Sequence, residues 1–275
     1  MKLSVFKEAL KERLVLLRAS LIFTAQRELA YTGNNWASVL STMAYTVSVL
    51  IFIKVIYANV RLVAGYSYND MLFFFFISQL TYYANYMVTI RNLNDLIADV
   101  NKGNLDMVLV KPVPSLFYLM TRSVSLVSII TDALAPTLAI IFSINWLALK
   151  ITLPAIMIGF VVWIMGLVAI HTFQLLAGLV VFWVGESENV LDLASNMTAA
   201  SGSRIPFEGY NRGFQILLGT VVPMLIAGGF TTSILLGKSN STVLLVWALV
   251  VGIGAFVIRG FAWRLALKHY TSASS

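Results

Sequence analysis

Cysteine is absent from this 275-residue chain, and charged side chains are scarce. Without cysteine, neither a disulfide nor a thiolate metal site can form. Only 11% of the residues are charged and 59% are hydrophobic, whereas soluble domains carry about 25% charged and about 45–50% apolar residues. The mean hydropathy is +0.85. The composition therefore excludes an ordinary soluble domain and predicts an integral membrane protein.

Histidine is also rare, since the chain contains only His171 and His269. Neither has a carboxylate nearby or a metal-binding spacing such as His-Glu-x-x-His. We therefore expect no catalytic residue, metal or cofactor in this chain. An integral membrane enzyme acting on lipids would need acid, base or metal-binding residues gathered at one interface. It is one alternative function, and a passive channel or membrane scaffold is another.

A near-match to a phosphate-binding loop occurs at residues 232–239, TSILLGKS, with Thr232 in place of the first glycine. A working loop of this kind follows a buried strand and opens a helix, so that backbone N–H groups surround the phosphates. Here the segment stands at the end of a hydrophobic run. The chain is therefore not expected to hydrolyse a nucleotide itself.

Long hydrophobic runs recur six times, each of about 20 residues or more and long enough to cross a hydrocarbon core of about 30 Å. Trp36, Trp146, Trp183 and Trp263 fall near their ends, where indoles favour the membrane interface. The sequence thus predicts an all-α protein with six transmembrane helices. The expected spans cover residues 36–60, 68–89, 115–142, 153–184, 213–236 and 242–264.

The basic residues orient these spans, because Lys and Arg accumulate on the cytoplasmic side of a membrane. With the N-terminus inside, all but four of the 19 Lys and Arg residues fall in cytoplasmic segments or at cytoplasmic span ends. The exceptions are Lys54, Arg61, Lys150 and Lys238. We expect both termini in the cytoplasm, and the net charge of +7 indicates anionic lipid rather than nucleic acid as the partner.

Residues 1–30 precede the transmembrane domain of residues 31–275 as a separate unit. Apolar residues follow a helical stripe with basic residues between them, which is typical of a helix lying in the membrane interface. A soluble helix packed on a partner is the alternative. The stripe consists of Leu3, Phe6, Leu10, Leu14, Leu17 and Leu21.

A short polar island, Arg91–Pro114, separates the second and third expected spans. Four of its apolar residues share one face of a helix, because they recur at i, i+3, i+4 and i+7. They are Leu93, Leu96, Ile97 and Val100. Gly103 follows where a helix would end in a left-handed residue. The orientation puts this amphipathic helix in the cytoplasm, where it predicts contact with another molecule.

A second cytoplasmic loop is expected over residues 185–212. Amphipathic spacing recurs there at Val190, Leu193, Ala194 and Met197. The expected outer loops, at residues 61–67, 143–152 and 237–241, are short. They leave no external domain for a large ligand.

Polar residues inside the expected spans are candidates for a translocation pathway, because hydrocarbon makes them costly. Asp132 lies in mid-span, and Pro136 removes the helical hydrogen bond to its carbonyl. This carboxylate either lines a path for a cationic substrate or is satisfied by a neighbouring hydroxyl such as Thr131 or Thr137. His171 and Gln174 form a second polar step, which packing and helix–helix hydrogen bonds explain equally well.

After Gly103 the island continues as G-x-L-D-x-x-L-x-K-P into the third span. This arrangement resembles the first cytoplasmic loop of the type-2 ABC exporter permeases (ABC-2 family), in particular the short six-span bacterial branch without a fused ATPase. The Ile205-Pro206-Phe207 turn also resembles that branch. One departure is the stretch of residues 237–241, which looks too short for the re-entrant external segment that many members carry before their last span.

The resemblance implies that the island is a coupling helix docking on a separate ATPase subunit. Leu93, Leu96, Ile97 and Val100 would form the docking face, and Asp95 and Asp99 would supply polar contacts. Gly103 would end the helix, while Asp106, Lys111 and Pro112 would fix the return into the membrane.

The resemblance further implies a permease subunit of an ATP-driven exporter in the bacterial cytoplasmic (inner) membrane. A second permease, identical or homologous, would complete a dimer, and ATP and Mg would bind the partner ATPase. The short outer loops and apolar interior favour an amphipathic substrate, such as a lipid, a drug-like cation or a small hydrophobic peptide. Asp132 would favour the cation.

Overall fold

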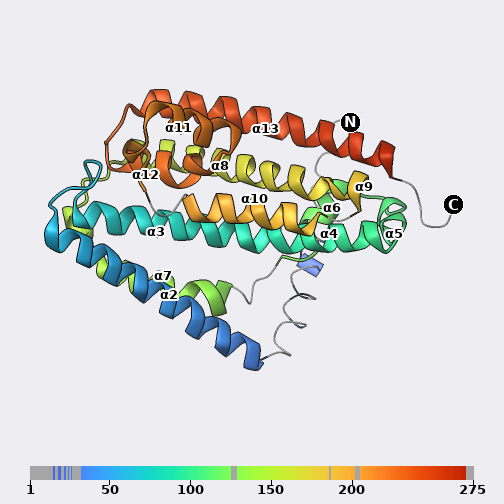
Figure 1. Cartoon of the computed structure of the whole chain (residues 1–275), viewed down its shortest axis with the longest axis horizontal. Helices are drawn as coiled ribbons and strands as arrows, with labels where there is room; N and C mark the ends of the chain where they lie inside the picture. Colours follow the sequence, from blue (N-terminus) through green and yellow to red (C-terminus); the bar gives the residue numbers. More distant parts are fainter. Residues whose placement is uncertain are drawn as a thin grey trace.

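The computed structural model describes residues 32–124, 129–185, 187–201 and 205–270, together with six isolated positions between Val15 and Gln26. This part of the chain is helical, with one isolated bridge between Val63 and Tyr66 and no strand. Most of its helices run along a common long axis, whereas the helix at residues 32–59, drawn in blue, runs obliquely away from them (Figure 1). The all-α class is thereby confirmed. The interfacial helix expected over residues 1–30 lies outside the described residues, apart from those six positions.

The bundle has two ends, named here by what they contain. The loop end gathers residues 60–67, 144–152, 205–211 and 236–240. The tip end gathers residues 102–114, Gly185 and Ser187 with the last turn of the C-terminal helix (Figure 1). At the loop end, Asn69 Nδ2 donates to the Asn145 carbonyl at 3.0 Å and Lys238 Nζ donates to the Gly65 carbonyl at 2.9 Å.

Within the described residues, three stretches of helix are long and apolar enough to cross a membrane, and they lie at residues 36–59, 153–184 and 241–269. They belong to α2 (Thr32–Asn59), to α8 (Leu153–Leu179) with α9 (Val181–Val184), and to α13 (Ser241–His269). The helices α8 and α13 pack against each other along much of their length. The six-span, N-in topology stays a prediction.

The polar island and the second expected span form one continuous helix. α3 (Tyr68–Asn85), the π-helical turn η1 (Tyr86–Ile90) and α4 (Arg91–Asn101) follow without a break, because the junction residues keep helical dihedrals. The whole helix is about 50 Å long at 1.5 Å per residue. The predicted island helix is therefore the end of a long rod (Figure 1).

The third expected span, residues 115–142, is divided. It begins with α6 (Ser115–Thr121) and resumes as the π-helical η2 (Ile129–Leu134) and α7 (Ala135–Ser143). Pro136 lies in the first turn of α7, where its missing N–H costs nothing. The short helices α5 (Leu105–Leu109) and η3 (Trp146–Ala148) lie in the connections on either side.

The sequence-based path between residues 185 and 236 is wrong. The expected cytoplasmic loop contains α10 (Glu188–Ser201), which packs along α8 from the tip end. The chain then reaches the loop end, where Tyr66 Oη donates to Glu208 Oε2 at 2.8 Å beside the turn η4 (Phe207–Gly209). Arg212 therefore lies at the loop end and not, as the charge count assumed, at the tip end.

The fifth expected span, residues 213–236, is a helical hairpin. One arm is α11 (Arg212–Ile216) with η5 (Leu217–Val221), and the other is η6 (Ile226–Phe230) with α12 (Thr231–Leu235). The helix axis bends by 110° between the two arms. Pro223 explains the break, since it lacks an N–H and disfavours helix at the preceding Val222. Both arms end at the loop end (Figure 1), so the chain turns back on itself here before α13.

The hairpin packs tightly on α8 at one glycine. A Cβ added to Gly166 would lie 2.4 Å from the backbone nitrogen of Ala227, so only glycine permits this approach. Around the contact, α8, α13 and the hairpin share a core that includes Val162, Leu225 and Phe230. The hairpin is thus held inside the bundle.

Candidate functional site

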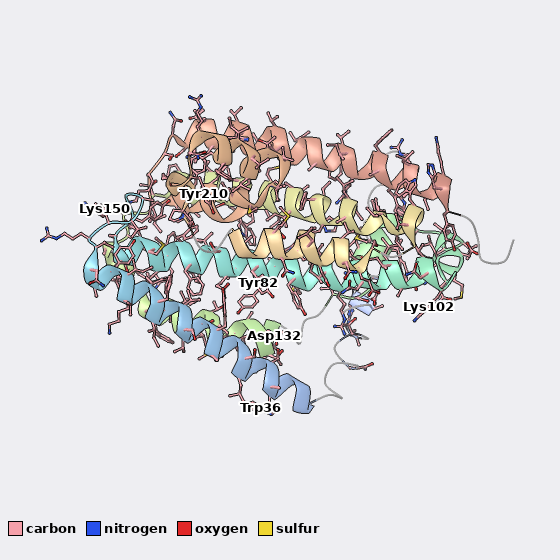
Figure 2. All side chains as sticks on the ribbon, in the orientation of Figure 1. Trp36, Tyr82, Lys102, Asp132, Lys150 and Tyr210 are labelled. Atoms are coloured by element: carbon pink, nitrogen blue, oxygen red, sulfur yellow. The ribbon has the colours of Figure 1, made fainter. Side chains whose placement is uncertain are left out.

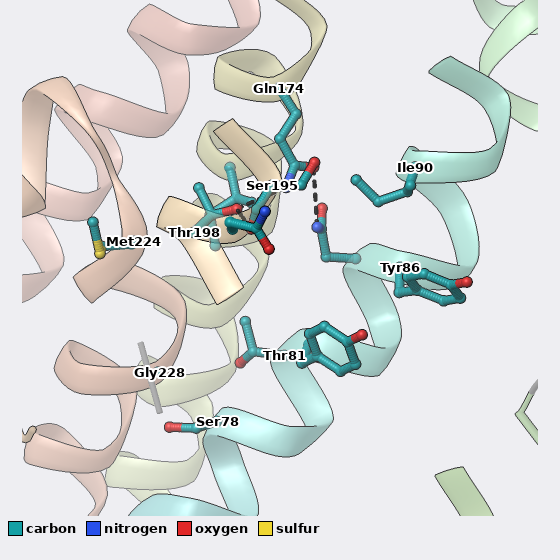
Figure 3. Close-up of a pocket in the computed structure, with 13 residues that line it drawn as sticks. Ser78, Thr81, Tyr86, Ile90, Gln174, Ser195, Thr198, Met224 and Gly228 are labelled. Carbon is teal, nitrogen blue, oxygen red and sulfur yellow. Dashed lines mark hydrogen bonds between the residues drawn. The ribbon is translucent and has the colours of Figure 1, made fainter. Parts of the chain in front are cut away.

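A cavity of about 190 Å³ lies at the centre of the bundle (Figure 3). The long helix, α8, α10 and the hairpin each contribute to its wall. Its lining is Ser78, Thr81, Tyr82, Asn85, Tyr86, Ile90, Ile170, Gln174, Ser195, Asn196, Thr198, Met224 and Gly228. Hydroxyl and amide groups dominate this list and no carboxylate, lysine or arginine belongs to it. Apolar atoms nevertheless form most of the surface that faces the cavity, so it suits an uncharged group with apolar parts.

A chain of hydrogen bonds crosses the cavity wall and joins three helices. Asn85 Nδ2 donates to Gln174 Oε1 at 3.0 Å, and Gln174 Nε2 donates to Thr198 Oγ1 at 2.7 Å (Figure 3). Thr198 Oγ1 in turn donates to the Ala194 carbonyl at 3.0 Å. The buried Oδ1 of Asn85 has no partner within the described residues. It is an open acceptor, and an unmet buried acceptor is costly.

The π-helical turn η1 begins directly after Asn85 and supplies Tyr86 and Ile90 to the lining. A π turn inserts one extra residue into a helix and is frequent at functional sites. Here it lies at the level of the cavity. The π-helical turn η1 therefore lies at the same level of the long helix as the residues that line the cavity.

The four predicted pathway residues are separated in the structure. Gln174 lines the central cavity, whereas His171 lines a second, open cavity of about 610 Å³. His171 Nδ1 lies 3.0 Å from Thr89 Oγ1. Asp132 and Pro136 line neither cavity. Sequence reasoning missed Asn85 and Thr198, whose only signal was an amide and a hydroxyl at helical positions.

Asp132 is held by hydroxyl groups, which was one of the two alternatives. Its Oδ1 accepts from Ser38 Oγ of α2 at 2.6 Å and from Thr131 Oγ1 at 2.8 Å. It lies in the space between α2 and α3 (Figure 2). Pro136 is buried at the start of α7. The carboxylate therefore joins η2 to α2 and stays apart from the central cavity.

The apolar face of α4 is turned into the protein, contrary to the docking role expected for it. Leu93, Leu96 and Ile97 are each 0% exposed. They pack in a core at the tip end with Leu105, Val108, Leu119, Met120, Leu175, Leu179, Val181, Phe182, Leu191, Trp263 and Ala266, and Val100 lies at the edge of this core. Because the chain itself covers this face, these three side chains are not available to a partner here.

The polar face of α4 is also engaged within the chain. Asp99 Oδ2 pairs with Arg122 Nη1 at 2.5 Å, and Asp95 Oδ2 accepts from Ser123 Oγ at 2.5 Å. Gly103 ends the helix with φ +70°. Its N–H bonds the Val100 carbonyl, and the N–H of Asn104 bonds the Asp99 carbonyl, the paired closure expected of a left-handed C-terminal glycine.

The exposed surface of the tip end lies beyond this cap. On α5 and just after it, Met107 is 63% exposed and Val110 is 82% exposed. Lys102, Lys111 and Pro112 are also exposed, and Lys111 Nζ donates to Tyr118 Oη at 2.6 Å. Asp106 is partly buried in the first turn of α5. The tip therefore presents apolar and basic side chains on residues 102–112.

A carboxylate at the loop end, which sequence reasoning did not single out, holds the hairpin. Glu208 accepts hydrogen bonds from Tyr66, Ser233 and Ser239. Burial, together with the charge of Glu208, raises the pKa of Tyr66. Beside this group, Lys238 Nζ forms an ion pair with Asp70 Oδ2 at 2.9 Å. The lysine of the phosphate-loop look-alike is thus engaged in a structural contact.

The long apolar helices indicate a multi-pass membrane protein. The model of the ABC-2 family transporter proteins matches residues 43–274, and the chain therefore belongs to that family, as a membrane transport permease. No curated protein and no solved structure matches it. Among the described residues, no group of three His, Asp or Glu is placed to hold a metal ion.

Proposed function

We propose that this chain is the permease subunit of an ATP-driven exporter, in which the central cavity is the closed substrate pathway. The observation that carries the proposal is the uncharged cavity, with hydroxyl and amide groups among its lining residues, between the long helix, α8, α10 and the hairpin in a member of the ABC-2 family. At about 190 Å³ it is smaller than the roughly 300–1,000 Å³ of typical ligand pockets. Its walls must therefore separate before a substrate enters.

The long helix Tyr68–Asn101 offers a mechanical link for that separation. Its cavity wall at Asn85 and Tyr86 and its tip at Asn101 belong to one rod, and the apolar face of α4 fixes the rod in the tip core. A partner that displaces α5 would move this core and the rod with it. We assign the docking of a separate ATPase subunit to the exposed residues 102–112. ATP and Mg would bind that subunit, on the cytoplasmic side of a bacterial inner membrane.

A second permease completes the pathway in this proposal. On the side of α10 away from α8, Val190 is 41% exposed, Leu193 62% and Met197 38%. Apolar side chains at helical spacing on a helix that also lines the cavity favour contact with another membrane subunit. The substrate is amphipathic, such as a lipid, a drug-like cation or a small hydrophobic peptide. The part that reaches this cavity is uncharged, since Asp132 lies elsewhere.

Co-purification with a co-expressed candidate ABC ATPase subunit tests the docking surface. Met107→Asp combined with Val110→Asp should lower the amount of bound ATPase at least tenfold, because burying either carboxylate at an apolar contact costs several kcal/mol. Leu147→Asp is the matched control, since Leu147 is 99% exposed at the loop end. Equal binding by wild type and the double variant would remove the docking surface from the proposal.

A further inference from the structure

The second cavity, which contains His171, is an open groove between helices of the tip half. Its wall is formed by η1, α6, α8 and α13, and the side chains include Val88, Leu116, Phe117, Met120 and Leu167. Apolar residues make up most of the lining. Its volume of about 610 Å³ falls within the range of pockets that hold small molecules.

Arg259 is the one formally charged side chain that lines this groove. It lies on α13, partly buried, and within the described residues it forms no ion pair. The contact found for it is with the ring of Phe256, whose centroid is 4.5 Å from the guanidinium carbon. An arginine in a membrane segment is costly without a counter-charge. The groove therefore combines apolar walls with an unneutralised cation.

Arg259 lies close to the level at which α6 begins. One turn further along α13, the indole of Trp263 donates to Ser115 Oγ at 3.2 Å, where α6 begins. Pro114, directly before α6, also lines the groove. From this level the groove follows α6 inward to Thr121, about 10 Å of helix, toward Thr89 and His171.

We propose that this groove binds one anionic phospholipid, with its phosphate at Arg259 and the first part of an acyl chain along α6. Charge complementarity selects the headgroup, because a zwitterionic lipid brings its own cation beside the phosphate. A guanidinium holds phosphate with paired N–H donors. The apolar lining accounts for the chain. This site is separate from the proposed substrate cavity, and the two share Asn85 in their linings.

The test is native mass spectrometry of the purified full chain with phosphatidylglycerol or phosphatidylcholine at equal concentration. Wild type should retain one phosphatidylglycerol in preference to phosphatidylcholine. Arg259→Gln should reduce that preference about tenfold, as expected when a charge-assisted bond to phosphate is lost. Arg264→Gln is the matched control, because Arg264 is exposed five residues later on α13, outside the groove. It should leave the preference unchanged.

A second variant distinguishes lipid binding in the groove from attraction to positive charge alone. Val168→Phe fills the groove from α8 and keeps every charge, so it should also displace the bound phosphatidylglycerol. Equal losses in Arg259→Gln and Arg264→Gln would show non-specific attraction to basic residues and overturn the site. Displacement of the lipid by glycerol phosphate alone would equally overturn it, since the acyl chain would then contribute nothing. Neither readout needs the ATPase or transport, so the site stands or fails independently of the proposed function.

Discussion

The hairpin Arg212–Leu235 and the helix α10 are neighbours in the chain. Hydropathy predicts that the hairpin crosses the membrane and that α10 lies in a loop outside it, but the structure shows neither. The hairpin is apolar enough to cross a membrane, but its arms bend by 110° and return to the loop end. In contrast, α10 carries Glu188, Asp192 and Asn196, and it runs into the bundle from the tip end.

The difference shows that a segment's path depends on its partners as well as its average polarity. Thr198 of α10 accepts from Gln174 inside the protein, while Glu188, Asp192 and Asn196 stay exposed. Protein rather than lipid covers the turn of the hairpin, because Met224, Leu225 and Ile226 are buried against the rest of the chain. A hydropathy average detects neither the hydrogen-bond partner nor the break at Pro223.

The largest expected effect concerns which end of the bundle Arg212 occupies. Since the chain lacks cysteine, single cysteines at Arg212, Leu147 and Val110 are clean probes, and all three positions are exposed. A membrane-impermeant maleimide on intact cells should label Arg212→Cys and Leu147→Cys alike, and Val110→Cys only after permeabilisation. Labelling of Arg212→Cys together with Val110→Cys would restore the hairpin as a membrane span.

A second effect tests how firmly the hairpin is held inside. Gly166→Ala places a Cβ 2.4 Å from the Ala227 backbone nitrogen, and we expect a loss of about 3 kcal/mol, the upper range for overpacking. Gly254→Ala is the matched control, because a Cβ at Gly254 meets nothing within 4 Å. The measurement is thermal unfolding in detergent. Similar melting temperatures for the two variants would mean that the hairpin moves freely from α8.

The smallest expected effect concerns the polar partners of α10. Gln174→Leu leaves the amide of Asn85 without its acceptor and should destabilise the protein by about 1 kcal/mol, in line with hydrogen bonds inside membranes. Asn85→Leu with Gln174→Leu should recover part of this loss, because both partners become apolar. A double-mutant cycle in thermal unfolding measures the coupling. Strict additivity would show that the hydrogen bond between these residues contributes nothing.

The local features of the chain were predictable where they depend on neighbouring residues. The spacing of Leu93, Leu96 and Ile97 predicts the helix α4, and Gly103 predicts its end, as the structure confirms. The same spacing says nothing about what covers the apolar face. Leu175 and Trp263 cover it from far along the chain, so the pattern predicts burial equally well against a partner or within the fold.

The candidate site was predictable only in part, for a similar reason. Gln174 stood out as an amide inside an apolar run, and it does line the central cavity. Asn85 and Thr198 become notable through their bonds with it, which depend on how α3, α8 and α10 are placed. Asp132 attracted attention as a lone carboxylate, yet hydroxyls from Ser38 and Thr131 satisfy it.

The end of the long helix separates residues that are buried in the tip core from residues that are exposed beyond it. Leu93, Leu96 and Ile97 are fixed by the tip core, whereas Met107 and Val110 stand free of it. Substitutions at exposed positions away from special features usually change stability by less than about 0.5 kcal/mol. In the proposed docking role, the exposed tip residues can therefore be exchanged at little cost to stability, whereas the residues that hold the rod in place cannot. A change of partner would require no change of fold.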